Sequence, residues 1–510
     1  MTGKRFLWPA LLAALLGVYD CLPLRASEPG PSPKHVDANG TRHNIVFILT
    51  DDLEMGGIQA MPQLKKLLVD QGTSLSNFFV TVSLCCPSRS SILRGQYVHN
   101  HGITQNTRGF QKFRDLGHES STVAIWLKAA GYTTALMGKY LNGYPGKGGE
   151  TYVPPGWDEW HSPIDNRKAY GGFGYRMNEN GKIVTYGDAP KDYLTDVLAR
   201  KAKVFIKRAA AKGTPFFLYL APYTPHNPAT PAPRHQNLFP SARAPQISSF
   251  NEKNLSTKPA FVRTLPSLTE EDIDGIDQLY RKRLQSLQAV DDLLADMIAA
   301  LKETGLLQKT YIVFTSDNGF HLGQHRLMPG KQTAYEEDIR VPLVIRGPGM
   351  PAGHVVSHLA LETDLAPTFA EWAGAAPPSF VDGRSLAPLL RSNPPRLAEW
   401  RQGVLIEHMQ ESKPFLTGLK KRTLGDKLHV PAYTAMRSMN YLYVEYETGE
   451  RELYDLRKDP AELTNTYASA PADLRARLSS WIARVRNCSG LNCRSAEETP
   501  LAEGILHRAG

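Results

Sequence analysis

The chain is poor in the features that mark small disulfide-bonded, fibrous or disordered proteins. Only five of its 510 residues are cysteine, and it has no internal repeat and no low-complexity tract. Charged residues make up 21% and hydrophobic residues 42%, a balance typical of globular proteins rather than disordered ones. Because a chain of this length exceeds one ordinary hydrophobic core, we expect two domains.

Long apolar runs are also scarce. The one at the N-terminus, from Phe6 to Val18, follows Lys4 and Arg5 and is too short to span a bilayer. This pattern is typical of a secretory signal peptide, with Ala26 as a candidate cleavage site. We therefore predict a signal peptide over residues 1–26, a leader over 27–43, and a secreted, periplasmic or lysosomal protein with no stable membrane span.

The few cysteines fall into two pairs once the signal peptide is removed. Cys488 and Cys493 are close enough in sequence to close a small loop by a disulfide, which fits an oxidising compartment. Cys85 and Cys86 are poor partners for each other, since adjacent Cα atoms lie about 3.8 Å apart, below the usual disulfide range. They remain available for other chemistry.

The formal net charge of +9 has two interpretations. It could steer polyanionic substrates toward the protein, or it could be an ordinary basic surface of a secreted protein. We expect no nucleic-acid partner.

The first part of the chain alternates apolar runs with helical patterns. We predict strands over 44–50, 133–137, 216–221, 311–315 and 341–345. Helical periodicity lies between them, most clearly where Leu287, Val290 and Leu294 share one face. Strands that alternate with helices favour an α/β fold with a mostly parallel sheet sandwiched by helices. We assign this domain to residues 44–375.

A smaller domain is expected over residues 376–510. Its strand patterns are shorter, at 404–408, 433–436, 441–446 and 452–456, and Gly449 between the last two predicts a hairpin. A helical pattern follows from about Ala472 to Arg486. The composition favours an antiparallel sheet with one covering helix.

Polar residues follow two of the predicted strands directly. Asp51 and Asp52 come after the first strand, and Asp317 and Asn318 come after the strand that ends near residue 315. Ligands of open parallel sheets bind beyond the carboxyl ends of the strands. Three carboxylates and an amide at that edge predict a site for Ca²⁺ or Mg²⁺, although either pair alone is more often a turn or a helix cap.

The segment Cys85-Cys86-Pro87-Ser88-Arg89 resembles the signature of the type I, formylglycine-dependent sulfatase family. The resemblance implies that Cys85 is oxidised to formylglycine by a formylglycine-generating enzyme, and that Arg89 supports it. It also implies an alkaline-phosphatase-like fold, with Cys85 completing the metal site. Sulfur is a soft ligand that matches a hard cation poorly, and an oxygen-bearing formylglycine would remove this mismatch.

Three further residues match sulfatase positions, which implies roles for them. Lys139 and Lys331 would hold the sulfate group, and His226 would protonate the leaving oxygen. The resemblance favours Ca²⁺ over Mg²⁺. Family members often carry a second histidine where this chain has Leu141, so Asn142, His101 or a water would have to accept the proton that accompanies sulfate release.

Within the family, the chain is most similar to N-acetylglucosamine-6-sulfatases. The strings that carry this likeness are 84–89, 97–101, 138–142 and 319–324. We therefore expect a sulfated carbohydrate substrate such as N-acetylglucosamine-6-sulfate. Three alternatives stay open: a phosphonate or phosphate monoester hydrolase of the same superfamily, an inactive protein that binds sulfated glycans, and a structural secreted protein, which leaves the clustered polar residues unexplained.

Overall fold

The computed structural model describes residues 42–409 and 429–500. The predicted signal peptide and all but the last two residues of the predicted leader lie outside these ranges. Within them, no helix combines the length and the apolar character needed to cross a membrane.

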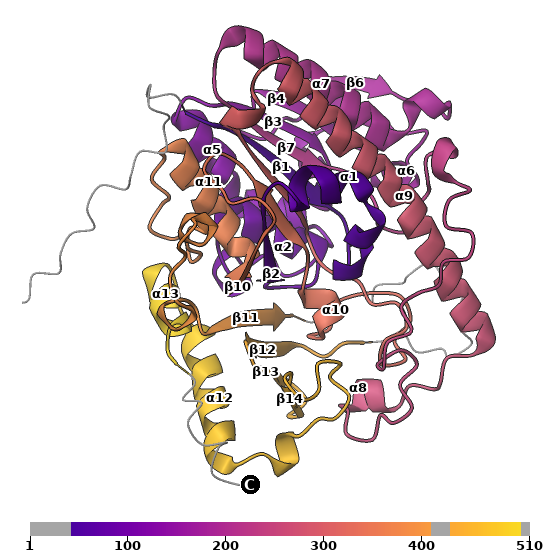
Figure 1. The fold of residues 1–510 in the computed structure, drawn as a ribbon, viewed down its shortest axis with the longest axis vertical. Helices are drawn as coiled ribbons and strands as arrows, with labels where there is room; N and C mark the ends of the chain where they lie inside the picture. The colour runs from indigo at the N-terminus through magenta and orange to yellow at the C-terminus, as the bar shows by residue number, and fades with distance from the viewer. Residues whose placement is uncertain (1–41, 410–428, 501–510) are drawn as a thin grey trace, which may run out of the picture. The chain divides into compact units, whose positions relative to one another are not determined.

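A ten-stranded sheet forms the main body, with strands in the order β10-β2-β9-β8-β1-β7-β3-β4-β5-β6 (Figure 1). The run from β8 to β4 is parallel, β2 and β10 pair in parallel, and β9, β5 and β6 are antiparallel to their neighbours. The strands are β1 (Asn44–Thr50), β2 (Thr73–Phe79), β3 (Thr133–Gly138), β4 (Glu159–Pro163), β5 (Arg176–Glu179), β6 (Lys182–Thr185), β7 (Phe216–Ala221), β8 (Thr310–Ser316), β9 (Leu343–Arg346) and β10 (His354–Leu361).

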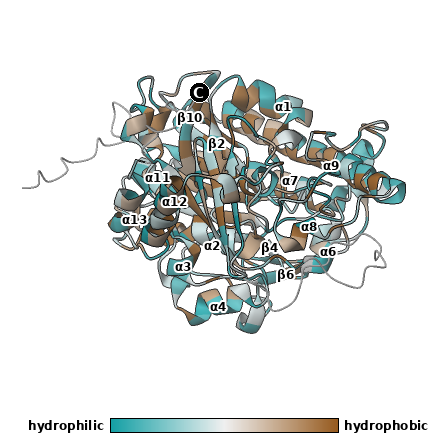
Figure 2. Ribbon diagram, turned by 90° about the horizontal axis from the view of Figure 1, so that it is seen from below, coloured by the Kyte–Doolittle hydropathy of each residue, from teal (hydrophilic) through white to brown (hydrophobic). Residues whose placement is uncertain are grey.

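Helices cover both faces of this sheet, because the central strands are apolar on both sides. All seven residues of β1 are buried: Ile45 and Phe47 belong to one hydrophobic core, and Val46 and Ile48 to the other. The first core takes side chains from α2 (Cys85–Arg94), α5 (Val123–Ala129) and α11 (Leu365–Ala373), and the second from α1 (Pro62–Leu64), α7 (Leu194–Lys212) and α9 (Glu270–Glu303). In Figure 2 the ribbons of the covering helices carry both hydrophobic and hydrophilic residues, as expected for helices with one buried face. Shorter helices connect them: α3 (Val98–His101), α4 (Gly109–Asp115), α6 (Asn166–Gly171), α8 (Ala260–Arg263) and α10 (Glu336–Ile339).

The C-terminal part forms a separate antiparallel sheet in the order β11-β12-β13-β14. Its strands are β11 (Gly403–His408), β12 (Tyr433–Ser438), β13 (Tyr441–Tyr446) and β14 (Arg451–Asp455). The predicted hairpin is present, and Gly449 in its turn has φ 88°, a conformation that favours glycine. One hydrophobic core contains both β1 and β13 side chains, so the domain boundary near residue 376 stays a prediction.

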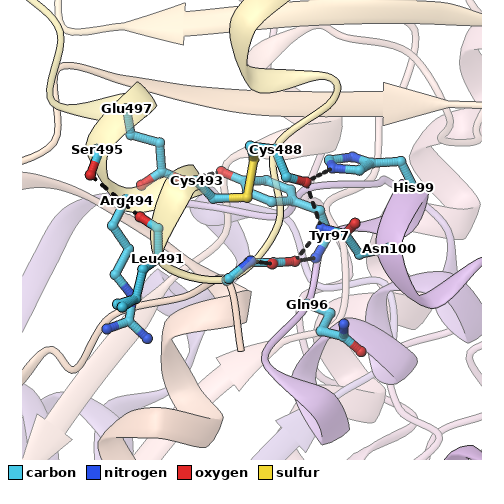
Figure 3. The surroundings of a disulfide bond; sticks show 12 residues. Gln96, Tyr97, His99, Asn100, Cys488, Leu491, Cys493, Arg494, Ser495 and Glu497 are labelled. Atoms are coloured by element: carbon cyan, nitrogen blue, oxygen red, sulfur yellow. Dashed lines mark hydrogen bonds between the residues drawn. A yellow bond between two sulfur atoms is a disulfide. The ribbon is translucent and has the colours of Figure 1, made fainter. Parts of the chain in front are cut away.

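Two helices, not one, accompany this sheet. α12 (Ala472–Val485) matches the predicted helix, and α13 (Leu491–Glu497) follows it. The predicted disulfide between Cys488 and Cys493 is present in the link between them (Figure 3). The carbonyl of Cys488 accepts hydrogen bonds from His99 and Asn100 at 3.0 Å each, which fastens this link to α3.

Candidate active site

The carboxyl ends of β1 and β8 bring the predicted ligand residues together. These strands are parallel neighbours with Thr50 opposite Ser316, so the residues that follow them meet at one edge. The backbone N–H of Asp52 donates to Asp317 Oδ1 at 3.1 Å, and Asn318 Nδ2 donates to Asp52 Oδ1 at 2.7 Å. Asp51, Asp52, Asp317 and Asn318 are all almost completely buried.

Cys85, the first residue of α2, lies against these carboxylates. Its Sγ is 3.3 Å from Asp51 Oδ1 and 3.8 Å from Asp52 Oδ1. Burial, reinforced by the charge of Asp51, raises the pKa of the Cys85 thiol well above its usual value. A protonated thiol is a poor nucleophile and a poor metal ligand. Cys86 instead packs against Gly109, where an added Cβ would lie 2.3 Å from its Sγ.

Arg89 lies one helical turn after Cys85 and is 1% exposed. Its Nε donates to Asp317 Oδ2 at 2.7 Å, and its Nη1 donates to the carbonyl of Lys139 at 3.0 Å. Arg89 thus joins α2 to the ends of β8 and β3 and holds one carboxylate of the cluster in place.

Two buried ammonium groups neutralise part of the negative charge. Lys139 Nζ donates to Asp51 Oδ2 at 2.6 Å, and Lys331 Nζ lies 2.8 Å from Cys85 Sγ and also donates to Asp52. Burial alone would raise the pKa of Asp51, but Lys139 and the other nearby cations hold it well below its usual value. Burial would lower the pKa of Lys139, yet Asp51 holds it well above its usual value. The charged forms therefore persist at neutral pH.

His226, which follows β7, lies against the carboxylate cluster. Its Nε2 lies 3.5 Å from Asp52 Oδ2, and its Nδ1 bonds the carbonyl of Asn227 at 2.7 Å. Burial lowers the pKa of His226, although Asp52 and Asp51 oppose the shift. A small cavity whose lining includes Tyr170, Thr224 and His226 adjoins the ring.

Sequence reasoning missed two groups that shape this site. Tyr170 packs on the His226 ring with centroids 4.2 Å apart, and Lys139 Nζ lies 5.3 Å from the centre of the Tyr170 ring. Arg283 is fully buried in α9 and donates to the carbonyl of Asp52 and to Glu54. No local motif marks either residue, because each is brought to the site by a distant element.

The residues around the missing histidine have structural contacts. Leu141 is buried in the hydrophobic core. His101 accepts a hydrogen bond from the N–H of Ile103 at Nδ1 and contacts Ser91 Oγ through Nε2, so both ring nitrogens are occupied. The side-chain oxygen of Asn142 is buried without a hydrogen-bond partner among the described residues. Of these side chains, Asn142 alone has a polar atom still to be satisfied.

The donor set fits a hard divalent cation. One ligand atom each from Asp51, Asp52, Cys85 and His226 lies within 4.8 Å of the others. Asp317 Oδ1 accepts from the N–H of Asp52, and Asn318 Oδ1 accepts from Lys331 Nζ at 3.3 Å. Carboxylate and amide oxygens suit Ca²⁺ and Mg²⁺. The sulfur of Cys85 is the one soft donor that does not fit such an ion.

The fold, with this cluster of buried charged groups at the strand ends, is that of an alkaline-phosphatase-like α/β hydrolase. Residues 43–375 match the sulfatase family model, and residues 323–487 match the model for the C-terminal part of N-sulphoglucosamine sulphohydrolase. The chain belongs to the sulfatase family and is a sulfuric ester hydrolase.

Individual relatives agree with this assignment. The chain is 35% identical over 519 residues to human N-acetylglucosamine-6-sulfatase, covering 96% of this chain and 90% of that protein. It is 39% identical to the extracellular sulfatase SULF-1 homolog of Drosophila melanogaster over 73% of this chain, but it spans 34% of that longer protein. A structure solved with its substrate D-glucosamine-2-N,6-O-disulfate shares the fold, with a TM-score of 0.70 and 24% identity over 87% of this chain and 97% of that one.

Proposed function

We propose that the protein hydrolyses sulfate esters through a formylglycine formed from Cys85, with one divalent cation, Ca²⁺ rather than Mg²⁺, held by Asp51, Asp52, Asp317 and Asn318. The observation that carries this proposal is the position of Cys85 at the start of α2, between two carboxylates and 2.8 Å from Lys331 Nζ. An unmodified, protonated thiol has no evident role among hard oxygen ligands, whereas an oxygen at this position completes the donor set.

The proposed chemistry divides between the modification, the ion and the side chains. Formylglycine at position 85 would supply a hydrated aldehyde whose oxygen attacks sulfur. A bound cation would supply Lewis-acid stabilisation of negative charge. Lys139 and Lys331 would hold sulfate oxygens, which the N-terminal N–H groups of α2 also favour.

Other residues of the chain would donate and accept the protons of the reaction. His226 faces the adjoining cavity and would protonate the departing oxygen, while Tyr170 fixes its ring. Leu141 cannot accept the proton that accompanies sulfate release. Because both ring nitrogens of His101 already have hydrogen-bond partners, Asn142 or a water would accept this proton.

We further propose a sulfated glycan as substrate, with 6-O-sulfated N-acetylglucosamine as the leading candidate. The support is the likeness to human N-acetylglucosamine-6-sulfatase, which extends over nearly the whole of both chains. A sugar 6-sulfate has a poor alkoxide leaving group, so it needs the general acid and close positioning that the buried cluster offers.

A substrate panel tests this proposal. Sulfated monosaccharides and glycosaminoglycan oligosaccharides, with phosphonate and phosphate monoesters beside them, should show the highest kcat/KM for 6-O-sulfated N-acetylglucosamine. Preference for another sulfate position would overturn the substrate proposal alone. Preference for phosphonate esters would support the alternative chemistry, and binding of sulfated glycans with no turnover would support the inactive binding protein.

The bound cation and the modification of Cys85 are each tested by a separate measurement. Elemental analysis of the active protein should find Ca²⁺, and Asp317→Ala should lose both the ion and activity. The mass of the peptide that contains Cys85 should show an aldehyde in place of the thiol after expression with a formylglycine-generating enzyme. The proposed location is secreted, periplasmic or lysosomal, in keeping with a disulfide at Cys488.

A further inference from the structure

A second cluster of ligand-type side chains lies away from the catalytic carboxylates. His325 comes from the loop that leads from β8 to Lys331, Glu337 belongs to α10, and Glu462 follows β14. One ligand atom of each residue lies within 4.8 Å of the others. The cluster therefore joins the loop that carries Lys331 to the segment after the C-terminal sheet.

Each of the three side chains has one atom held and one atom without a hydrogen-bond partner. Glu252 Oε2 bonds His325 Nδ1 at 2.7 Å, Ser249 Oγ lies 3.4 Å from Glu337 Oε1, and the N–H of Glu336 donates to Glu462 Oε2 at 3.1 Å. The opposite atoms, His325 Nε2, Glu337 Oε2 and Glu462 Oε1, are buried with no partner among the described residues. Burying a polar atom without a hydrogen bond is unfavourable, so three such atoms in one cluster suit a bound ligand.

The pairing of Glu252 with His325 is the arrangement that metal-binding histidines use. A carboxylate on Nδ1 makes this nitrogen the proton donor, which leaves the buried, unpartnered Nε2 as an acceptor. His325 is fully buried, and Glu462 is 1% exposed.

The nearby cationic side chains bond groups other than the carboxylates of Glu337 and Glu462. Lys258 Nζ donates to the backbone carbonyl of Glu462 and lies 3.8 Å from Glu252 Oε2, and Arg437 pairs with Glu336. In the described part of the chain, neither Glu337 nor Glu462 forms an ion pair.

We propose that His325, Glu337 and Glu462 bind a structural divalent transition-metal ion, for which Zn²⁺ is the probe. One imidazole nitrogen with carboxylate oxygens suits Zn²⁺, whereas the all-oxygen set beside Cys85 suits Ca²⁺. The partly exposed side of Glu337 gives the ion a way in. The bound ion would fasten the loop that carries Lys331 to the C-terminal segment.

The test uses the full-length protein, stripped with a chelator and then saturated with Ca²⁺. Titration calorimetry and elemental analysis should find one Zn²⁺ per chain and a higher Tm with zinc than with Ca²⁺ alone. His325→Ala and Glu337→Gln should weaken zinc binding by about 100-fold or more, and Glu252→Gln by about 10–100-fold, since it orients the histidine. Asp317→Ala should keep this zinc while losing Ca²⁺.

A matched control separates ligation from general damage. His99 is also paired with a glutamate, Glu407, but its second ring nitrogen bonds the carbonyl of Cys488. His99→Ala should therefore keep the zinc. The proposal is overturned if no Zn²⁺ binds in the presence of Ca²⁺, or if Glu337→Gln and Glu462→Gln bind it as the wild type does. In the second case the carboxyl groups share protons instead of a metal.

Discussion

At the residue scale, two adjacent cysteines have opposite environments. Cys85 faces carboxylates and Lys331 at the active site, whereas Cys86 packs against Gly109 in the hydrophobic core. Consecutive side chains of a helix point in directions about 100° apart. Two neighbouring residues can therefore face different surroundings, one among polar groups and the other in the core. The structure thus assigns the two thiols to different surroundings.

Replacement of each cysteine measures this difference. Cys85→Ala should abolish sulfate ester hydrolysis with little change in Tm, because the nucleophile is lost while the fold is kept. Cys86→Ala should keep most of the activity and lose about 1–2 kcal/mol of unfolding free energy, since it leaves a small cavity in the core. Turnover of a chromogenic aryl sulfate and denaturant unfolding are the measurements. Wild-type activity in Cys85→Ala would end the formylglycine hypothesis.

His226 should show its role through the leaving group. His226→Ala should lower kcat/KM for alkyl sulfates by about 10²–10⁴-fold, the range typical of general acid catalysis. Aryl sulfates with acidic phenols need little protonation and should lose much less. A plot of log kcat/KM against leaving-group pKa should therefore become steeper in the variant. Equal losses for both substrate types would exclude His226 as the general acid.

At the element scale, α13 is fastened to the main domain by buried charge. Arg401 donates to both oxygens of Asp364 at 2.6 and 2.8 Å and to Glu497 of α13 at 2.7 Å, and all three side chains are 0% exposed. Removing one member leaves buried charges without a partner, which costs more than the pair contributes when intact.

Two arginine variants compare the contribution of this buried network to stability with that of a surface ion pair. Arg401→Met should lower the unfolding free energy by about 3–5 kcal/mol, since Asp364 loses its ion-pair partner and Glu497 is left with Arg384. Arg396→Met, which removes an exposed pair with Glu399, should leave the unfolding curve unchanged within error. Chemical denaturation of both variants is the measurement, and similar midpoints would show that the buried network contributes little.

At the scale of the whole molecule, buried neutral histidines couple stability to pH. Burial, with Lys201 nearby, lowers the pKa of His161 from 6.5 to about 4, and burial lowers that of His408 to about 4 as well. Between these values the unfolded chain binds protons that the folded protein excludes. The unfolding free energy contributed by these groups is therefore present above pH 6.5 and is lost as the pH falls toward 4.

His161→Gln should make the unfolding free energy depend less strongly on pH. Glutamine does not titrate, so the variant should lose less unfolding free energy than the wild type between pH 6.5 and about 4. Urea unfolding across this range gives both slopes. Parallel curves for the two proteins would mean that His161 keeps the same pKa in the folded and unfolded chains.

Much of the core and of the catalytic cluster followed from the sequence alone. The central strands β1, β3, β7 and β8 were predicted within about one residue, because strands buried on both faces of a parallel sheet are continuous apolar runs. The strand-end rule predicted that Asp52 and Asp317 would meet, as they do, and the sulfatase-like motif pointed to Cys85, whose Sγ lies 3.3 Å from Asp51 Oδ1. The catalytic role of Cys85 stays a prediction. The strands β2, β4, β5, β6 and β10 were not predicted, and the expected strand over 341–345 begins instead at Leu343, after Pro342, because proline cannot donate a ladder hydrogen bond.

Tertiary structure alone decided which distant side chains meet. Arg283 reaches the carbonyl of Asp52 from α9, and Tyr170 covers His226 from α6. The cluster of His325, Glu337 and Glu462 joins the loop after β8, α10 and the segment after β14. Sequence periodicity reports which face of an element is buried, and motifs report chemistry within a short segment. Contacts across more than a hundred residues depend on how whole elements pack, and no local pattern encodes that packing.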